Sequence, residues 1–157
     1  MIRTPPERRI AEADEADCEW FLAADDALFH VYAVVRFGDR YTLRIDWLKE
    51  SVLTFEPMTR PDGSLAPLGR GRFNYAALAR VLAPLLRGRH YSLLRLNCRT
   101  VTFLVLTKVG FDAERLLARY ERHQLLCGLV TRECFSAATI RELVAWLHAK
   151  AAARRIA

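Results

Sequence analysis

Residues 29–46 read FHVYAVVRFGDRYTLRID, and this stretch determines the architecture of the chain. Its first half, Phe29–Phe37, is an almost unbroken apolar and β-branched run, which is typical of a central strand covered on both faces. Gly38 opens a tight turn, and Tyr41–Asp46 then alternates apolar and polar residues. The stretch predicts a β-hairpin at the centre of a sheet, and we expect a third strand over Val52–Glu56.

Loops and one helix are expected after the hairpin. Arg60–Arg72 holds two prolines and three glycines and is interpreted as a surface loop. Asn74 can cap a helix over Tyr75–Leu86, which Pro84 should end or bend. A further loop then leads to a short strand-like stretch, Ser92–Leu96.

Cys98–Val109 is predicted to be a buried helix, because it is apolar almost all round. Asn97 is a favourable N-cap, and Gly110 stands where a C′ glycine belongs. Two more helices are expected, over 113–126 with Asp112 as its cap and over 137–153.

The N-terminal part carries an acidic segment. Residues 1–10 are interpreted as a loose arm. Residues 11–26 contain seven carboxylates and no cation, and we expect them to form a short acidic helix that docks by its aromatic end. This segment is a candidate surface for a protein partner, although the chain's own arginines are the closer match for its charge.

Length and composition fit one globular domain. The chain has 157 residues, of which 52% are hydrophobic and 27% charged, so a largely disordered protein is excluded. We expect a single α+β domain with a small antiparallel sheet packed with helices. Residues 28–110 hold the candidate site, and residues 112–157 form a helical C-terminal part.

The protein is basic, with 24 − 18 = +6 formal charges, and all but three of its cations are arginines. Such a surface suits anionic partners. The sequence matches no nucleic-acid-binding module and has no glycine-rich phosphate loop, so nucleic acid is not an expected partner. The spacing of Cys127, Cys134 and His123 is irregular, and we expect no metal and no cofactor.

The start of the sequence has no apolar stretch, so no signal peptide is expected, and no run is long enough to be a transmembrane segment. We therefore expect a cytoplasmic protein as synthesised, with its four cysteines as free thiols. Export by a route without a signal peptide stays open.

The chemistry-bearing pair is Cys98, at the start of the buried helix, with His30, at the start of the central strand. A helix N-terminus favours a thiolate, and a nearby imidazole can take the thiol proton. The backbone N–H groups of Cys98 and Arg99 would then point to where an oxyanion forms, with Asn97 positioning them. The pattern predicts thiol acyl chemistry.

The hairpin at 29–46 resembles the histidine-bearing hairpin of the NlpC/P60 superfamily. Residues 91–110, YSLLRLNCRTVTFLVLTKVG, resemble the Asn-Cys block of its circularly permuted branch, which includes the lecithin retinol acyltransferase and H-Ras-like suppressor families. In that branch the histidine precedes the cysteine, and a tyrosine before Asn-Cys and a Leu-x-x-x-Gly tail are common. The resemblance covers about 38 residues and implies a papain-like fold, with Cys98 as nucleophile and His30 as base.

The resemblance also implies a third polar residue on the returning strand, which orients the imidazole and is often a second histidine. By position this residue is Arg44, and Asp46 on the same face is the alternative that can accept a hydrogen bond from the ring. Arg99 stands where the acyltransferase subgroup has Glu, which favours a general thiol hydrolase.

Two functions follow from these patterns. The first is a thiol-dependent hydrolase or acyltransferase that acts on a peptide, cell-wall or acyl-lipid substrate. Within this class it would be a cysteine peptidase, an amidase or a thiol acyltransferase. The second is an inactive α+β binding module that engages a protein partner or an anionic polymer through its acidic and arginine-rich surfaces.

Overall fold

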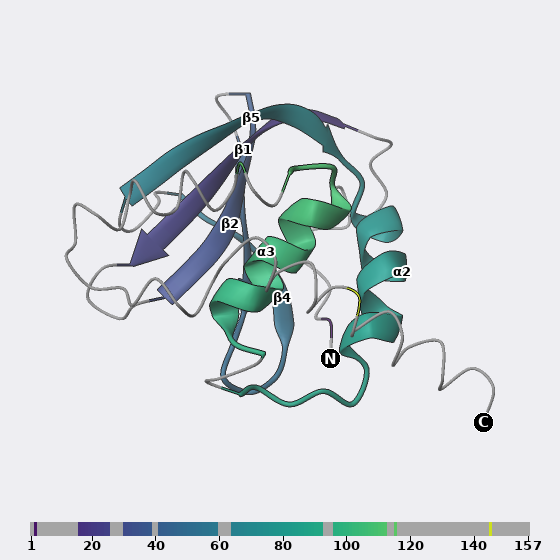
Figure 1. Cartoon of the computed structure of the whole chain (residues 1–157). Coiled ribbons are helices and arrows are strands. Elements are labelled where there is room, and N and C mark those ends of the chain that lie inside the picture. The colour runs from purple at the N-terminus through teal and green to yellow at the C-terminus, as the bar shows by residue number, and fades with distance from the viewer. Residues whose placement is uncertain are drawn as a thin grey trace.

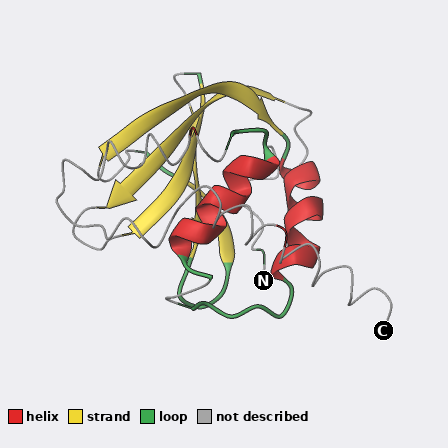
Figure 2. Cartoon of the chain, viewed as in Figure 1, coloured by secondary structure: helices red, strands yellow, loops and turns green. Residues whose placement is uncertain are grey.

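The computed structural model describes Ile2 and residues 16–25, 30–38, 41–59, 64–92, 96–112, 115 and 145. In these residues five antiparallel strands form one sheet in the order β4-β3-β2-β1-β5, and two helices lie together on one side of it (Figures 1 and 2). The elements in chain order are β1 (Ala16–Asp25), β2 (His30–Phe37), β3 (Tyr41–Trp47), β4 (Leu53–Pro57), β5 (Ser64–Phe73), α2 (Tyr75–Leu86) and α3 (Cys98–Lys108). The predicted α+β class with a small antiparallel sheet is confirmed.

The central hairpin is confirmed. Strands β2 and β3 pair antiparallel, with Val35 opposite Leu43, and Gly38 turns the chain with a φ of 58°. The middle of β2, from Val31 to Val35, is buried throughout, as its unbroken apolar sequence requires. The expected third strand is present as β4, one residue further along than predicted.

The acidic segment is not a helix in its described part, and that prediction is wrong for residues 16–25. These residues form β1, which lies between β2 and β5. The side chains that it contributes to the larger apolar cluster recur at every second position, at Cys18, Trp20, Leu22 and Ala24, which is the period of a strand. Two of its carboxylates pair with the protein's own arginines, Glu19 with Arg36 and Arg70, and Asp17 with Arg72.

The expected surface loop over 60–72 is also wrong in its described part, because residues 64–73 form β5. Among the described strands it lies at the edge of the sheet and pairs only with β1. An edge strand tolerates glycine and proline, and the register shifts where Phe21 faces Pro67 and Trp20 faces Gly69, which leaves a bulge. The composition of this segment alone therefore did not indicate that it forms a strand.

The two helices are confirmed. Helix α2 begins after its Asn74 cap and ends two residues beyond Pro84. Helix α3 begins at Cys98 after the Asn97 cap, and Gly110 follows it with a φ of 96°, as expected of a C′ glycine. Helix α3 packs on β2 and β3, and α2 packs on α3.

The remaining predictions concern the two ends of the chain and the stretch 92–96 before α3. Of the predicted strand over 92–96, Ser92 and Leu96 pair with each other through two backbone hydrogen bonds, and residues 93–95 lie outside the described residues. Ile2 bridges to Leu53, and the Asp112 side chain accepts from the Arg115 N–H as an N-cap does. The rest of the arm, residues 11–15 and 26, and the helices predicted over 113–126 and 137–153 lie outside the described residues, except for Arg115 and Ala145.

Two apolar clusters sandwich the sheet. The larger one lies between the sheet and the helices, and its biggest fully buried side chains include Trp20, Trp47, Phe55 and Phe103. The smaller one, with Ala23, Tyr32 and Val34 at its centre, contains alternate residues of β1 and β2 that face away from the helices. The start of β2 is thereby held rigidly on both faces, which matters because His30 begins this strand.

Candidate active site

Cys98 occupies the first position of helix α3, and the cap before it is fully formed. The Asn97 side chain accepts from the Thr100 N–H at 3.1 Å, and the Thr100 hydroxyl accepts from the Asn97 N–H at 3.0 Å. This reciprocal arrangement is a capping box. It fixes the helix N-terminus, whose positive dipole end favours an anionic sulfur.

The start of β2 meets α3 beside this sulfur. The Thr102 hydroxyl, one turn after Cys98, donates to the Val31 carbonyl at 3.1 Å and is buried. The Val31 N–H in turn donates to the Cys98 sulfur. Val31 therefore joins the strand to the helix from both sides of its backbone, and it holds the thiol against the strand that begins with His30.

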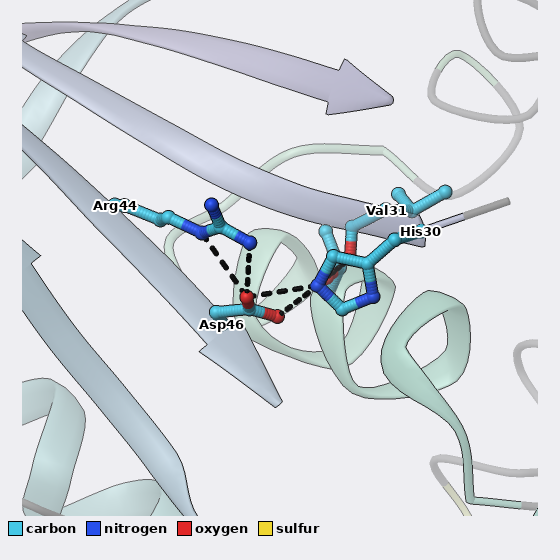
Figure 3. A network of polar contacts seen from close by, with 5 residues as sticks. His30, Val31, Arg44 and Asp46 are labelled. Carbon is cyan, nitrogen blue, oxygen red and sulfur yellow. Dashed lines mark hydrogen bonds and ion pairs between the residues drawn. The ribbon is translucent and has the colours of Figure 1, made fainter. Parts of the chain in front are cut away.

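The His30 side chain connects the sulfur to a buried carboxylate. Its ring is hydrogen-bonded to Cys98. Its Nε2 lies 2.8 Å from Oδ2 of Asp46 and 2.8 Å from Oδ1, so the ring faces both carboxylate oxygens (Figure 3). The Asp46 side chain is 1% exposed and that of His30 is 20% exposed. Three elements, β2, β3 and α3, thus contribute one side chain each to a continuous chain of contacts.

Arg44 completes the environment of the carboxylate. Its Nε and Nη2 donate to Oδ2 of Asp46 at 3.1 and 2.6 Å, and Figure 3 shows the guanidinium and the His30 ring approaching the carboxylate from different directions. The guanidinium also stacks over the Tyr32 ring, 4.0 Å from its centre. A buried carboxylate requires such partners, and here two of them fix its orientation.

These contacts shift the ionisation of the pair in opposite directions. The pKa of His30 is raised from 6.5 to about 9, chiefly by its hydrogen bond to Asp46 and then by that to Cys98, against the effect of burial. For Cys98 burial raises the pKa, but the hydrogen bonds from His30 and from the Val31 N–H, with the imidazolium charge, outweigh it and lower the pKa below 9.0. The pair therefore favours a thiolate beside an imidazolium.

Tyr91 is a further member of the site. Its hydroxyl exchanges hydrogen bonds with the Cys98 side chain and with the Cys98 backbone N–H. Its pKa is raised by burial and then by the nearby thiolate charge, and Arg99 partly offsets this. The neutral hydroxyl thus lies at the backbone donor that the sequence assigned to an oxyanion.

The structure brings together four of the six residues predicted from the sequence: Cys98, His30, Asp46 and Arg44. Of the two candidates for the third position, Asp46 contacts the imidazole, whereas Arg44 reaches it through Asp46. The Asn97 side chain caps the helix, and Arg99 lies half-buried at the second helical position.

Sequence reasoning did not select two residues of the site. Tyr91 had a signal, because a tyrosine before Asn-Cys is part of the resemblance described above. Val31 had none, since it acts through its backbone N–H and any residue at that position would carry the same donor.

No protein-family model, curated protein or solved structure matched the chain. None of the helices in the described ranges combines the length and the apolar character needed to cross a membrane.

Proposed function

We propose that the protein is a thiol-dependent hydrolase or acyltransferase of papain-like type, related to the permuted NlpC/P60 branch. One observation carries the proposal: a cysteine at a helix N-terminus and a histidine from a strand 68 positions away in the chain share a hydrogen bond, and a buried carboxylate orients the histidine. This is the arrangement of nucleophile, base and orienting group that acyl transfer needs.

The acylation step follows from the ion pair. The Cys98 thiolate attacks the carbonyl carbon of an amide or ester, the carbon–sulfur bond forms, and the carbonyl electron pair moves onto oxygen. When that pair returns, the bond to the amine or alcohol breaks, and the leaving group takes its proton from the His30 imidazolium. The product is a thioester on Cys98 with His30 neutral.

Deacylation restores the resting state. Neutral His30 takes a proton from water or from an acceptor amine or alcohol, which attacks the thioester. The thiolate then leaves, and the thiolate–imidazolium pair is re-formed. Nε2 of His30 is occupied by Asp46, so Nδ1 exchanges the proton with the reacting groups, and Asp46 keeps the ring in this orientation.

The helix N-terminus supplies the electrostatic part of the mechanism. The backbone N–H groups of Cys98 and Arg99 lie at the first turn of α3, where a developing oxyanion is stabilised. In the resting site the Tyr91 hydroxyl hydrogen-bonds to the Cys98 N–H. A substrate oxygen entering there takes over that N–H bond and has the Tyr91 O–H as a further donor.

Both substrate classes suit the protein, namely a peptide or isopeptide bond, as in cell-wall peptides, and an acyl-lipid ester or thioester. The basic surface suits either, because cell-wall polymers and membrane faces are anionic. The second function, an inactive binding module, gains less support, because Asp17 and Glu19 of the acidic segment pair with arginines of the same sheet.

Thiol labelling tests the proposal. At pH 6–7 we expect iodoacetamide to modify Cys98 well before Cys18, and His30→Ala to slow that reaction by about tenfold or more, since loss of the imidazolium raises the pKa of Cys98. Incubation with an activated fatty-acyl thioester and with a muropeptide-like peptide should then leave one acyl group on Cys98, detected by mass spectrometry.

The matched control is Cys18→Ser, which removes the other described buried thiol and should leave both labelling and acylation unchanged. Slow labelling of Cys18 and Cys98 at equal rates, with no effect of His30→Ala, would instead support the binding module.

A further inference from the structure

Ser51 adopts a backbone conformation that serine seldom takes. It has a φ of 62°, and in the described residues every other positive φ belongs to a glycine. It lies in the turn between β3 and β4, where its N–H donates to the Leu48 carbonyl at 2.9 Å and the Leu48 N–H donates to Val52 at 3.0 Å. Hairpin loops of this kind usually place glycine at the left-handed position, because a side chain there is strained. The presence of a serine calls for a second reason.

The Ser51 hydroxyl provides that reason. It accepts from the Tyr91 N–H at 2.7 Å, across forty residues of sequence. The neighbouring Trp47 donates from Nε1 to the Leu96 carbonyl at 3.3 Å. The β3–β4 hairpin therefore contacts the connection before α3 at Tyr91 and at Leu96, and Leu96 also pairs with Ser92.

The same loop delivers the Tyr91 hydroxyl to the nucleophile. We propose that Ser51 is a positioning residue: its left-handed backbone directs its hydroxyl to the Tyr91 amide, and this sets the Tyr91 hydroxyl against Cys98. The role rests on the proposed function, in which Cys98 is the nucleophile. The β3–β4 hairpin then serves both partners of the reaction, since Asp46 orients the imidazole and Ser51, five residues later, orients the group on the sulfur.

The charged and titratable groups around the sulfur set the direction of the expected effect. They are His30 from β2, Asp46 from β3, Arg99 from α3 and Tyr91 from the loop. Of these, Tyr91 is the group whose backbone N–H donates to the Ser51 hydroxyl. The Tyr91 O–H donates to the thiolate and stabilises it, so displacement of Tyr91 raises the pKa of Cys98.

The test uses the full chain and measures the rate of Cys98 alkylation by iodoacetamide against pH, with thermal unfolding alongside. The variants are Ser51→Gly, Tyr91→Phe and the double variant, with Glu50→Gly as the matched control at an exposed position of the same turn. Tyr91→Phe should raise the alkylation midpoint by about one pH unit, the size of a hydrogen bond to the charged form. Ser51→Gly should raise it in the same direction by a smaller amount, without lowering the unfolding temperature, because glycine adopts the left-handed conformation freely.

The double variant decides whether Ser51 acts through Tyr91. Its midpoint should equal that of Tyr91→Phe alone, and Glu50→Gly should match the wild type. An unchanged midpoint in Ser51→Gly, an additive shift in the double variant, or an equal shift in Glu50→Gly would each overturn the proposal.

Failure of the proposed function is seen separately. It would show as a wild-type midpoint at the value of an ordinary thiol that His30→Ala does not move. The effect of Ser51→Gly is the difference between the alkylation midpoints of this variant and the wild type. It can be measured at any value of the wild-type midpoint.

Discussion

Cys18 and Cys98 are buried to the same extent, each 5% exposed, yet the pKa values of their thiols shift in opposite directions. The pKa of Cys18 is raised to about 11, mainly by burial, with Asp17 adding to it and a hydrogen bond to Trp20 opposing it. At Cys98 the same burial is outweighed by partners, and the pKa is lowered. Burial alone therefore does not decide the direction in which the pKa of a thiol shifts.

The hydrogen-bond direction explains the contrast. The Cys18 thiol donates to the Gly71 carbonyl at 3.4 Å, an interaction that only the protonated sulfur can make. The Cys98 sulfur instead receives hydrogen bonds from the His30 ring and the Val31 N–H at a helix N-terminus. At Cys18 the hydrogen bond from Trp20 does not offset burial and the thiol keeps a proton that it donates to Gly71, whereas at Cys98 several donors together outweigh burial.

The largest expected effect is the difference between the two thiols themselves. At pH 7 we expect Cys98 to be alkylated more than about a hundredfold faster than Cys18, because the pKa of Cys18 is raised to about 11, that of Cys98 is lowered below 9.0, and each pKa unit changes the thiolate fraction tenfold. Peptide mapping after a time course with iodoacetamide measures both rates in one sample. Comparable alkylation rates of Cys18 and Cys98 in the folded protein would contradict the difference between their pKa values.

A smaller effect is expected from Asp46→Asn, which keeps the shape of the side chain and removes its charge. The pKa of His30 should fall from about 9 toward 6.5, since Asp46 is the main cause of the shift. The imidazolium then loses its proton at lower pH, and alkylation of Cys98 at pH 7 should slow by about tenfold. Titration of the His30 ring by NMR measures the pKa directly. A His30 pKa still near 9 in this variant would show that the carboxylate does not control the ring.

The same shift makes stability depend on pH. The folded pKa of His30 lies above its ordinary value of 6.5, so its contribution to the free energy of unfolding is complete below pH 6.5 and is lost as the pH rises through about 9. The lowered pKa of Cys98 acts oppositely, so the measurement belongs in a Cys98→Ser background. There, urea unfolding should show stability falling from pH 6 to 9, with the fall reduced by adding Asp46→Asn. An equal fall in both variants would assign the pH dependence to other groups.

Arg44→Gln tests which residue occupies the third position of the site. We expect it to change the alkylation rate of Cys98 by about threefold or less, as is typical of a partly exposed ion-pair partner. Arg44 contacts Asp46 and not the imidazole, so its loss should alter Cys98 reactivity much less than Asp46→Asn does. The same alkylation assay compares the two variants. An effect of Arg44→Gln larger than that of Asp46→Asn would make Arg44 the orienting residue, as the position along the strand alone suggested.

The region of Cys98 could be predicted from sequence because its signals are local. The apolar run of β2, the alternation of β3 and the Asn97 cap each indicate an element without knowledge of the rest. The contact between His30 and Asp46 could be predicted for the same reason, since both residues belong to one hairpin and its turn fixes the register.

The region of Cys18 could not be predicted in this way, because β1 and β5 depend on pairing between distant segments. Alanines and carboxylates in β1 indicate a helix locally, and glycine and proline in β5 indicate a loop. Strand β5 has β1 as its partner, with Arg70 and Arg72 of β5 facing Glu19 and Asp17, and β1 is held as a strand between β2 and β5. Tertiary pairing overrides local propensity here.

The smallest effect on Cys98 is expected from Gly71→Ala, which changes a residue beside Cys18. A Cβ at this position would lie 3.2 Å from Cδ1 and Nε1 of the buried Trp20 ring, so the ring must shift. Such overpacking costs about 1–3 kcal/mol, measured as a loss in the free energy of urea unfolding. Alkylation of Cys18 should accelerate as the β1–β5 pair loosens, whereas the pH midpoint of Cys98 should stay where it is, because the hydrogen-bond partners described for it, His30, Val31 and Tyr91, lie on β2 and before α3. The control, Arg70→Ala, changes an exposed neighbour on the same strand and should move neither thiol. If Gly71→Ala displaced the Cys98 midpoint as well, the two thiols would respond to one shared core, and the donor set around Cys98 would not be enough to explain its charge.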